Sequence, residues 1–209
     1  MPLYVLALTD GPADTAETDG GLLQDIDLNG IHAICERRST APPLTDDALR
    51  RQHAKVIAIS RRVRAVLPAR YGALLKRDEL LQLVRNNSVA IRRGLDDVRD
   101  RVQMTVRVLG SAARQVQAPT SSGREYLERR RQEASPVLPP RALAFIDAVG
   151  PFVVRQRQEC GAPGLIISLY HLVDAQKIAD YKAAARATAG TEIIATGPWP
   201  PFAFTPQLF

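Results

Sequence analysis

Residues 22–37 read Leu22-Leu23-Gln24-Asp25-Ile26-Asp27-Leu28-Asn29-Gly30-Ile31-His32-Ala33-Ile34-Cys35-Glu36-Arg37. Apolar residues flank Asn29-Gly30 on both sides, and Asn-Gly is the dipeptide most typical of the two-residue turn of a β-hairpin. The stretch therefore predicts a strand over residues 22–26, a turn at residues 28–30 and a second strand over residues 31–37.

The same residues also fit the formula of a calcium-binding loop. The formula requires Asp25, Asp27, Asn29 and Gly30, followed six residues later by an acid, here Glu36. A calcium loop needs a helix on each side, whereas the sequence around this one is typical of loops and strands. The hairpin is the favoured interpretation, and the calcium loop is the alternative.

Strands and helices are predicted on both sides of this hairpin. Residues 1–8 are apolar and predict a first strand, while Thr45 caps a helix that continues to Pro68. A second helix is expected from Asp78 to Val98, and the alternation of apolar and polar residues over 102–108 predicts another strand.

The second half repeats this mixture. Residues 110–123 are rich in small and polar residues, so we expect a linker there, between domains 1–112 and 113–209. The expected order after it is a short helix up to residue 131, a helical stretch over 139–153, a strand over 165–170, a helix over 174–189 and a strand over 192–195. The predicted fold class is α+β, with two small domains whose sheets are covered on one face by helices.

Composition limits the class of protein. The chain has 209 residues, 45% of them hydrophobic, a net charge of +6 and a pI of about 9.7, so a folded protein that tolerates an acidic partner is expected. No apolar run approaches the roughly 20 residues that a membrane span needs. Cys35 and Cys160 have no metal or redox spacing, and a cytoplasmic location is the default expectation.

Candidate catalytic and metal-binding groups are scarce. The histidines are His32, His53 and His171, and none has a second histidine or a cysteine at a metal-ligand spacing. His53 lies on the apolar face of its predicted helix, which favours a packing histidine over a general base. Phosphate-loop, dinucleotide and nucleophile-elbow motifs are missing. We therefore expect no enzyme activity, no cofactor and no metal.

Clusters of arginine provide a competing hypothesis. They occur at residues 37–38, 61–64, 92–93 and 129–131, and could neutralise the phosphates of a nucleic acid. Most of them lie beside acids, and aromatic residues are only 5% of the chain, without a stacking signature. A solvated surface is favoured, and a basic nucleic-acid-binding module is the alternative function.

The C-terminal stretch after the last predicted strand is unusual, because the only tryptophan of the chain stands between prolines. Prolines hold the backbone extended and leave few free donors, so aromatic rings can be presented at low entropy cost. We expect an inward clasp over the second domain, with an outward anchor for a partner as the alternative. The residues concerned are Pro198, Trp199, Pro200, Pro201, Phe202 and Phe204.

This stretch also carries a family resemblance. Residues 196–204, Thr-Gly-Pro-Trp-Pro-Pro-Phe-Ala-Phe, resemble the near-terminal signature of the gas vesicle protein L and F family. Weaker landmarks agree in order along the whole chain: Leu3-Tyr4-Val5, His53 with Val56-Ile57, Val66-Leu67-Pro68-Ala69-Arg70-Tyr71-Gly72 and Gly123-Arg124-Glu125-Tyr126-Leu127.

The resemblance implies two ferredoxin-like α+β domains and a non-enzymatic accessory role in gas vesicle formation. It also implies that the partners are the small hydrophobic shell protein and other accessory proteins, in the cytoplasm and associated with gas vesicles, with no nucleic acid and no membrane. A shell subunit with an exposed apolar face and open strand edges self-associates unless a partner covers it. The resemblance leaves open whether the chain is of the L or the F type.

Overall fold

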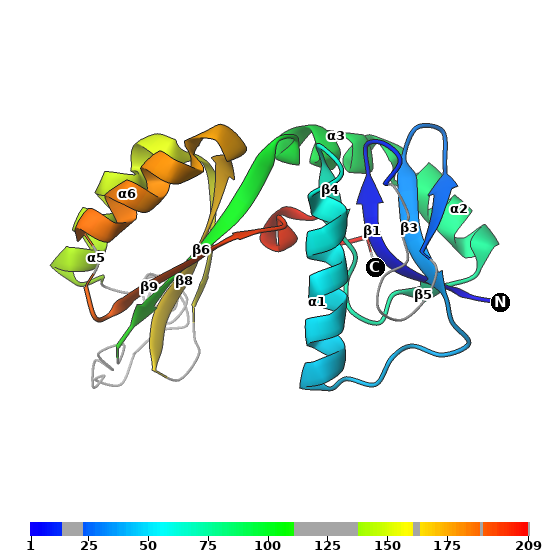
Figure 1. The fold of residues 1–209 in the computed structure, drawn as a ribbon, viewed down its shortest axis with the longest axis horizontal. Helices are drawn as coiled ribbons and strands as arrows, with labels where there is room; N and C mark the ends of the chain where they lie inside the picture. The colour runs from blue at the N-terminus through cyan, green and yellow to red at the C-terminus, as the bar shows by residue number, and fades with distance from the viewer. Residues whose placement is uncertain (14–22, 111–137, 161–163, 189, 209) are drawn as a thin grey trace, which may run out of the picture. The chain divides into compact units, whose positions relative to one another are not determined.

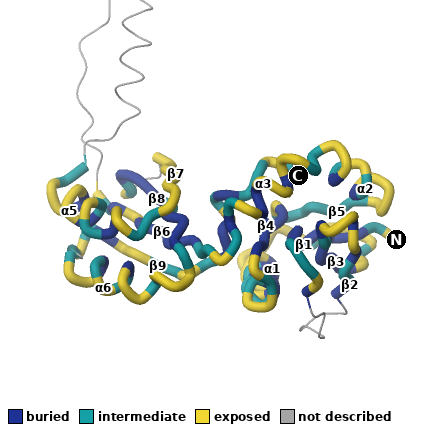
Figure 2. The backbone as a smooth tube through the Cα atoms, turned by 90° about the horizontal axis from the view of Figure 1, so that it is seen from above, coloured by how far each residue is buried: buried dark blue, intermediate teal, exposed yellow. Residues whose placement is uncertain are grey.

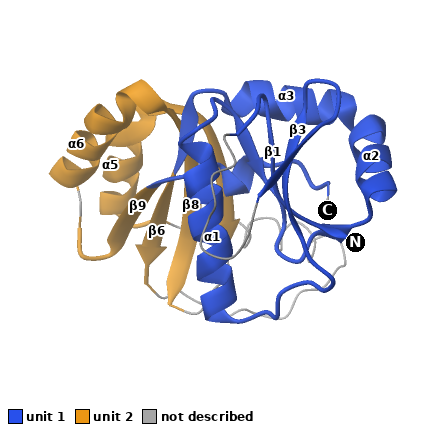
Figure 3. Cartoon of the chain, turned by 45° about the vertical axis from the view of Figure 1, so that its right-hand side comes forward, with its two compact units in different colours: residues 1–103, 198–209 blue, residues 104–197 orange. Residues whose placement is uncertain are grey.

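The computed structural model describes residues 1–13, 23–110, 138–160, 164–188 and 190–208 (Figure 1). These residues form two compact units (Figure 3). The first unit comprises Met1–Gln103 and Pro198–Phe209, and the second comprises Met104–Gly197. Each unit contains one sheet with helices, so the α+β fold class is confirmed.

Most elements of the first unit precede residue 100. In chain order they are β1 (Leu3–Thr9), β2 (Gln24–Asp27), β3 (His32–Arg37), α1 (Asp46–Ser60), β4 (Val66–Pro68), β5 (Leu74–Leu75), α2 (Arg77–Asn86), α3 (Ser88–Val98) and the 3-10 helix η3 (Phe202–Phe204). The sheet has the order β2-β3-β1-β4, and β5 also pairs with β1. Every residue of β1 is buried, because this strand is central and pairs antiparallel with β3, β4 and β5.

The hairpin prediction is confirmed. Strands β2 and β3 pair antiparallel from Gln24↔Cys35 to Asp27↔His32. Asn29 and Gly30 have φ angles of 61° and 78°, the left-handed conformation that a type I′ turn requires at both positions. The calcium-loop alternative is wrong, since strands flank the loop where that site needs helices.

Helices cover both faces of the first sheet, which corrects the expectation of one covered face. Val66 of β4 belongs to the same core cluster as Ile59 of α1. The next residue, Leu67, lies close to Gly94 of α3. Neighbouring residues of a strand point to opposite faces, so α1 and α3 pack on opposite sides. The sheet lies between these helices in Figure 2.

The second unit has the element order of a ferredoxin-like fold. Its elements are β6 (Arg101–Leu109), α5 (Pro140–Val149), η1 (Gly150–Phe152), β7 (Val153–Cys160), β8 (Leu165–Asp174), η2 (Ala175–Lys177), α6 (Ile178–Thr188) and β9 (Ile193–Trp199). The strand order is β7-β8-β6-β9, and α5 and α6 pack side by side. Phe145 of α5, Val106 of β6, Leu169 of β8 and Tyr181 of α6 share one buried core cluster.

The observed units differ from the predicted domains 1–112 and 113–209. Strand β6 was assigned to the first domain, but its apolar residues Met104, Val106 and Val108 lie in the core of the second unit. The C-terminal stretch was assigned to the second domain, yet Pro198–Phe209 belongs to the first unit. Both differences have the same cause, because contacts between segments distant in sequence decide which core a segment joins.

Several predicted boundaries also move. The first helix ends at Ser60, so β4 forms where a helix was expected, and the second helix is divided into α2 and α3 at Asn87. Strand β7 was missed, because its residues after Val153 are exposed and mostly polar and so lack the apolar alternation of a half-buried strand. The predicted linker beyond residue 110 and the helix before residue 131 lie outside the described residues.

Candidate functional site

The C-terminal stretch ends on the first unit, and its residues differ in exposure. Pro200, Pro201 and Phe204 are buried, and Phe204 is only 3% exposed. Trp199 is half-buried, Phe202 is 37% exposed and Pro198 is exposed. The six residues singled out from the sequence therefore divide into a buried group and a group that is partly or fully exposed.

Backbone hydrogen bonds hold this stretch in place. Phe202 N donates to Pro200 O at 2.8 Å, and Phe204 N donates to Pro201 O at 3.0 Å, which forms η3. Ala203 N donates to Oε1 of the buried Gln103 at 2.8 Å. Since the prolines have no N–H group, these bonds satisfy the donors of residues 202–204.

A close approach to α3 fixes the end of the stretch. A Cβ atom added at Gly94 would lie 3.1 Å from Cγ of Pro206 and 3.2 Å from Cδ1 of Leu67. Such distances are tighter than most real Cβ contacts, so glycine at this position lets Pro206 pack against the helix.

His53 of α1 joins the aromatic residues of the stretch to the helix. Its ring centroid lies 5.3 Å from that of Trp199 and 5.3 Å from that of Phe202, and it stacks on Phe202 with an interplanar angle of 19°. These ring contacts agree with the interpretation of His53 as a packing histidine.

An apolar pocket of about 430 Å³ opens beside Phe202. Its walls come from α1, from the turn after β4 and from η3. The lining residues are Leu49, Arg50, Gln52, His53, Ala69, Arg70, Tyr71 and Phe202. Arg50 and Arg70 are exposed, and within the described ranges neither guanidinium has a hydrogen bond or an ion pair. The pocket thus combines apolar walls with two uncompensated positive charges, and we call it the arginine pocket.

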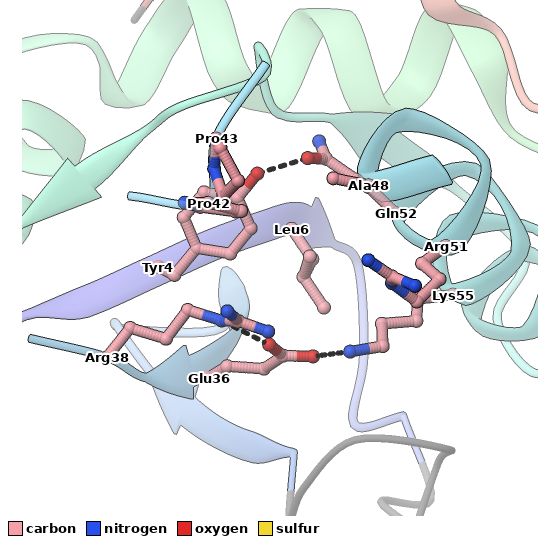
Figure 4. A pocket seen from close by; sticks show the side chains of 10 residues that line it. All are labelled: Tyr4, Leu6, Glu36, Arg38, Pro42, Pro43, Ala48, Arg51, Gln52 and Lys55. Atoms are coloured by element: carbon pink, nitrogen blue, oxygen red, sulfur yellow. Dashed lines mark hydrogen bonds and ion pairs between the residues drawn. The ribbon is translucent and has the colours of Figure 1, made fainter. Parts of the chain in front are cut away.

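A second pocket, of about 170 Å³, lies next to it and is shown in Figure 4. The buried Glu36 carboxylate forms ion pairs with the buried Lys55 and, at 2.8 Å, with Nε of Arg38. Tyr4 OH donates a hydrogen bond to Gln52 Oε1, and burial raises the pKa of Tyr4. We call this the glutamate pocket. Its buried charges are paired, as stability requires.

Burial shifts the pKa values of two further groups, Cys35 and His171. Burial raises the pKa of the Cys35 thiol to about 12, so the thiol is protonated and unreactive. His171 of β8 is fully buried, and this burial lowers its pKa to about 4. Its Nδ1 lies 2.8 Å from Tyr181 OH, and its Nε2 lies 3.1 Å from Gln156 Oε1.

The described part of the chain bears on both metal binding and the predicted arginine clusters. There, no three His, Cys, Asp or Glu side chains are grouped so that they could hold a metal ion. The predicted arginine clusters lie on separate elements, and several members have partners: Arg38 binds Glu36, Arg64 binds Asp100, and Arg92 donates to Asn29 O at 2.6 Å. The cluster at residues 129–131 lies outside the described residues.

Sequence reasoning found the C-terminal stretch but missed the pockets. One signal was available, because Lys55 is a charged residue on the apolar stripe of the predicted helix, beside Val56 and Ile59. A charge at such a position requires a buried partner. The partner, Glu36, comes from a strand of the hairpin, and nothing local in the sequence identifies it.

Comparisons with known proteins agree with the fold and extend over nearly the whole chain. The family described as "Gas vesicle synthesis protein GvpL/GvpF" matches residues 2–206. The solved structure of the gas vesicle protein GvpF from Anabaena sp. PCC7120 is similar with a TM-score of 0.73 and 14% identity, covering 98% of each chain. That of GvpF from Microcystis aeruginosa is similar with a TM-score of 0.74 and 11% identity, covering 97% of this chain and 98% of the other. No curated protein matches the sequence. In the described ranges, no helix is both long enough and apolar enough to cross a bilayer.

Proposed function

The chain belongs to the gas vesicle synthesis protein GvpL/GvpF family, and from this premise we propose that it is a non-enzymatic assembly factor. It binds the small hydrophobic shell protein and other accessory proteins in the cytoplasm. Its effect is to cover surfaces of the shell protein that would otherwise self-associate.

One observation supports this proposal most. The first unit exposes the apolar side chains of Leu49 and Phe202 at the border of a preformed pocket. The other side chains that line this pocket include arginines and aromatic rings. Aromatic residues and arginine are the types that contribute most to protein interfaces. The buried acids and bases nearby are paired with each other or protonated, which suits a binding surface better than a catalytic one.

The C-terminal stretch has two parts in this proposal. Pro200, Pro201 and Phe204 act as the clasp that fixes the stretch on the first unit. Trp199, which is half-buried, and Phe202, which is exposed, act as anchors for a partner. In this proposal the clasp packs on the first unit, whereas the sequence predicted a clasp over the second domain.

A gene deletion tests the proposed function in the cell. We expect that the deletion abolishes gas vesicles and that the wild-type gene restores them when supplied in trans. A pulldown with the purified chain is expected to capture the shell protein. Normal vesicles in a clean deletion strain would refute the proposal.

A further inference from the structure

We propose that the arginine pocket and the glutamate pocket form one docking groove for an acidic, apolar segment of a partner protein. The segment places a bulky apolar side chain against Leu49, Tyr71 and Phe202, and its flanking carboxylates bind Arg50 and Arg70. This inference rests on the proposed function, because it names the surface and the chemistry by which a partner is bound.

The two pockets adjoin each other. Gln52 lines both, and its Oε1 accepts the hydrogen bond of Tyr4, which lines the glutamate pocket. Tyr71, from the arginine pocket, donates its hydroxyl to Pro43 O at 2.8 Å, and Pro43 lines the other side. Gly72 N also donates to Tyr4 OH, at 3.4 Å. These bonds connect the residues that line the two pockets, and this proximity is the reason for assigning one bound segment to both.

The charge of the lining defines the ligand. The basic lining residues are Arg38, Arg50, Arg51, Lys55 and Arg70, and Glu36 is the one carboxylate that lines either pocket. Glu36 already pairs with Lys55 and Arg38, and Arg51 pairs with Asp47. Arg50 and Arg70 are left without an acid among the residues that the structure describes. A guanidinium binds a carboxylate with two parallel hydrogen bonds, so the groove favours a segment with acids.

The apolar walls define the other half of the ligand. Leu49 is 39% exposed and Phe202 is 37% exposed, although both are large apolar side chains. The cavity of about 430 Å³ between them falls in the size range of ligand pockets, roughly 300–1,000 Å³. Covering these side chains with an apolar group removes their surface from water, which stabilises the complex.

The groove needs little rearrangement to bind. Phe202 stacks on His53, and the residues next to it are held by the bond to Gln103 and by the clasp. Gln52 and Tyr71 are held by their hydrogen bonds to Tyr4 and Pro43. Since these side chains are ordered before binding, little conformational entropy is lost when the segment docks.

Fluorescence of Trp199, the only tryptophan, gives a direct test because its ring contacts His53 in the wall of the groove. The probes are a blocked nine-residue peptide with two leucines flanked by glutamates, and its counterpart with lysines in place of the glutamates. We expect saturable binding of the acidic peptide and none of the basic peptide. The double variant Arg50→Glu/Arg70→Glu should lose at least about tenfold in affinity for the acidic peptide and gain binding of the basic one.

A matched control carries the same charge change elsewhere. Arg77→Glu/Arg93→Glu alters two exposed arginines on α2 and α3, away from the groove lining, and should bind the acidic peptide as the wild type does. If the wild type does not bind the acidic peptide at peptide concentrations up to about 1 mM, the inference is overturned. Equal binding of the two peptides, or equal loss in both double variants, would overturn it too.

A parallel pulldown separates this inference from the proposed function. Capture of the shell protein by the wild type and the control, but not by Arg50→Glu/Arg70→Glu, supports both. Undiminished capture by Arg50→Glu/Arg70→Glu overturns the groove while the proposed function stands. Binding of the acidic peptide without any capture of the shell protein supports the groove and contradicts the proposed function.

Discussion

The two units differ in the polar side chains that they bury. In the first unit, the buried Glu36 and Lys55 form an ion pair, Glu36 also pairs with the half-buried Arg38, and all three line a pocket. In the second unit, the neutral ring of His171 is enclosed between Tyr181 and Gln156, with no exposed surface. Charges next to a pocket can act on a partner, whereas a closed neutral cluster can only support the fold.

This contrast assigns different tasks to the two units. The arginine pocket lies in the first unit. Leu49, Arg50 and Arg70 are exposed around it, and the C-terminal stretch adds Phe202. The second unit supplies β9, which leads the chain to that stretch. Four changes test this difference between the units.

The largest effect is expected from Glu36→Gln. The substitution removes the carboxylate between Lys55 and Arg38 and leaves the buried Lys55 charge uncompensated, so the first unit should lose about 3–5 kcal/mol. Urea unfolding followed by Trp199 fluorescence measures this loss. Asp47→Asn, in the exposed pair with Arg51, is the control and should change stability by less than about 1 kcal/mol. Similar losses in the two variants would contradict the structural role of the buried pair.

Phe204→Ala comes next, with an expected loss of about 3–4 kcal/mol, because it removes the buried aromatic ring of the clasp and leaves a cavity. The loss should appear in the first unit, although the residue follows the second unit in the chain. Hydrogen exchange is expected to accelerate in β1 and α1 and to stay unchanged in β8 and α6. Gln207→Ala, at an exposed position, serves as the control. Faster exchange confined to the second unit would refute the placement of the stretch.

Acid should destabilise the second unit through His171. Burial lowers its pKa to about 4 from the ordinary value of 6.5, so the unfolded chain binds the proton first. The stability that this neutral ring confers is present above pH 6.5 and declines as the pH falls from 6.5 to about 4, by about 3 kcal/mol in total. Hydrogen exchange in β8 and α6 over this pH range measures the decline. His171→Gln should flatten it, and a persistent slope in that variant would contradict the assignment.

The smallest effect is expected from Trp199→Ala. The ring is half-buried and rests on His53, so its removal should cost the first unit about 1–2 kcal/mol, less than the roughly 3–5 kcal/mol of a fully buried tryptophan. Circular dichroism during thermal unfolding measures the loss. A cost equal to that of Phe204→Ala would show that the ring belongs to the clasp and is no anchor.

Local chemistry explains which features were predictable from the sequence. The hairpin could be predicted because Asn29-Gly30 determines its turn. The α+β class could be predicted from the periodicity of the apolar residues. The unusual C-terminal stretch was recognised from its prolines and its single tryptophan.

Long-range contacts explain the rest. The pairing of Glu36 with Lys55 and the hydrogen bond from Ala203 to Gln103 join residues that no sequence pattern relates. The same holds for β6, whose alternation is equally compatible with either sheet. The pockets depend on these contacts, so their lining could not be predicted.

The assignment of partner binding to α1 and the C-terminal stretch of the first unit can be tested by hydrogen exchange of the full chain, with and without the shell protein. We expect new protection in Asp46–Ser60 and in residues 199–208 when the shell protein binds. Protection confined to the edge strands β7 and β9 of the second sheet, with α1 unchanged, would contradict it.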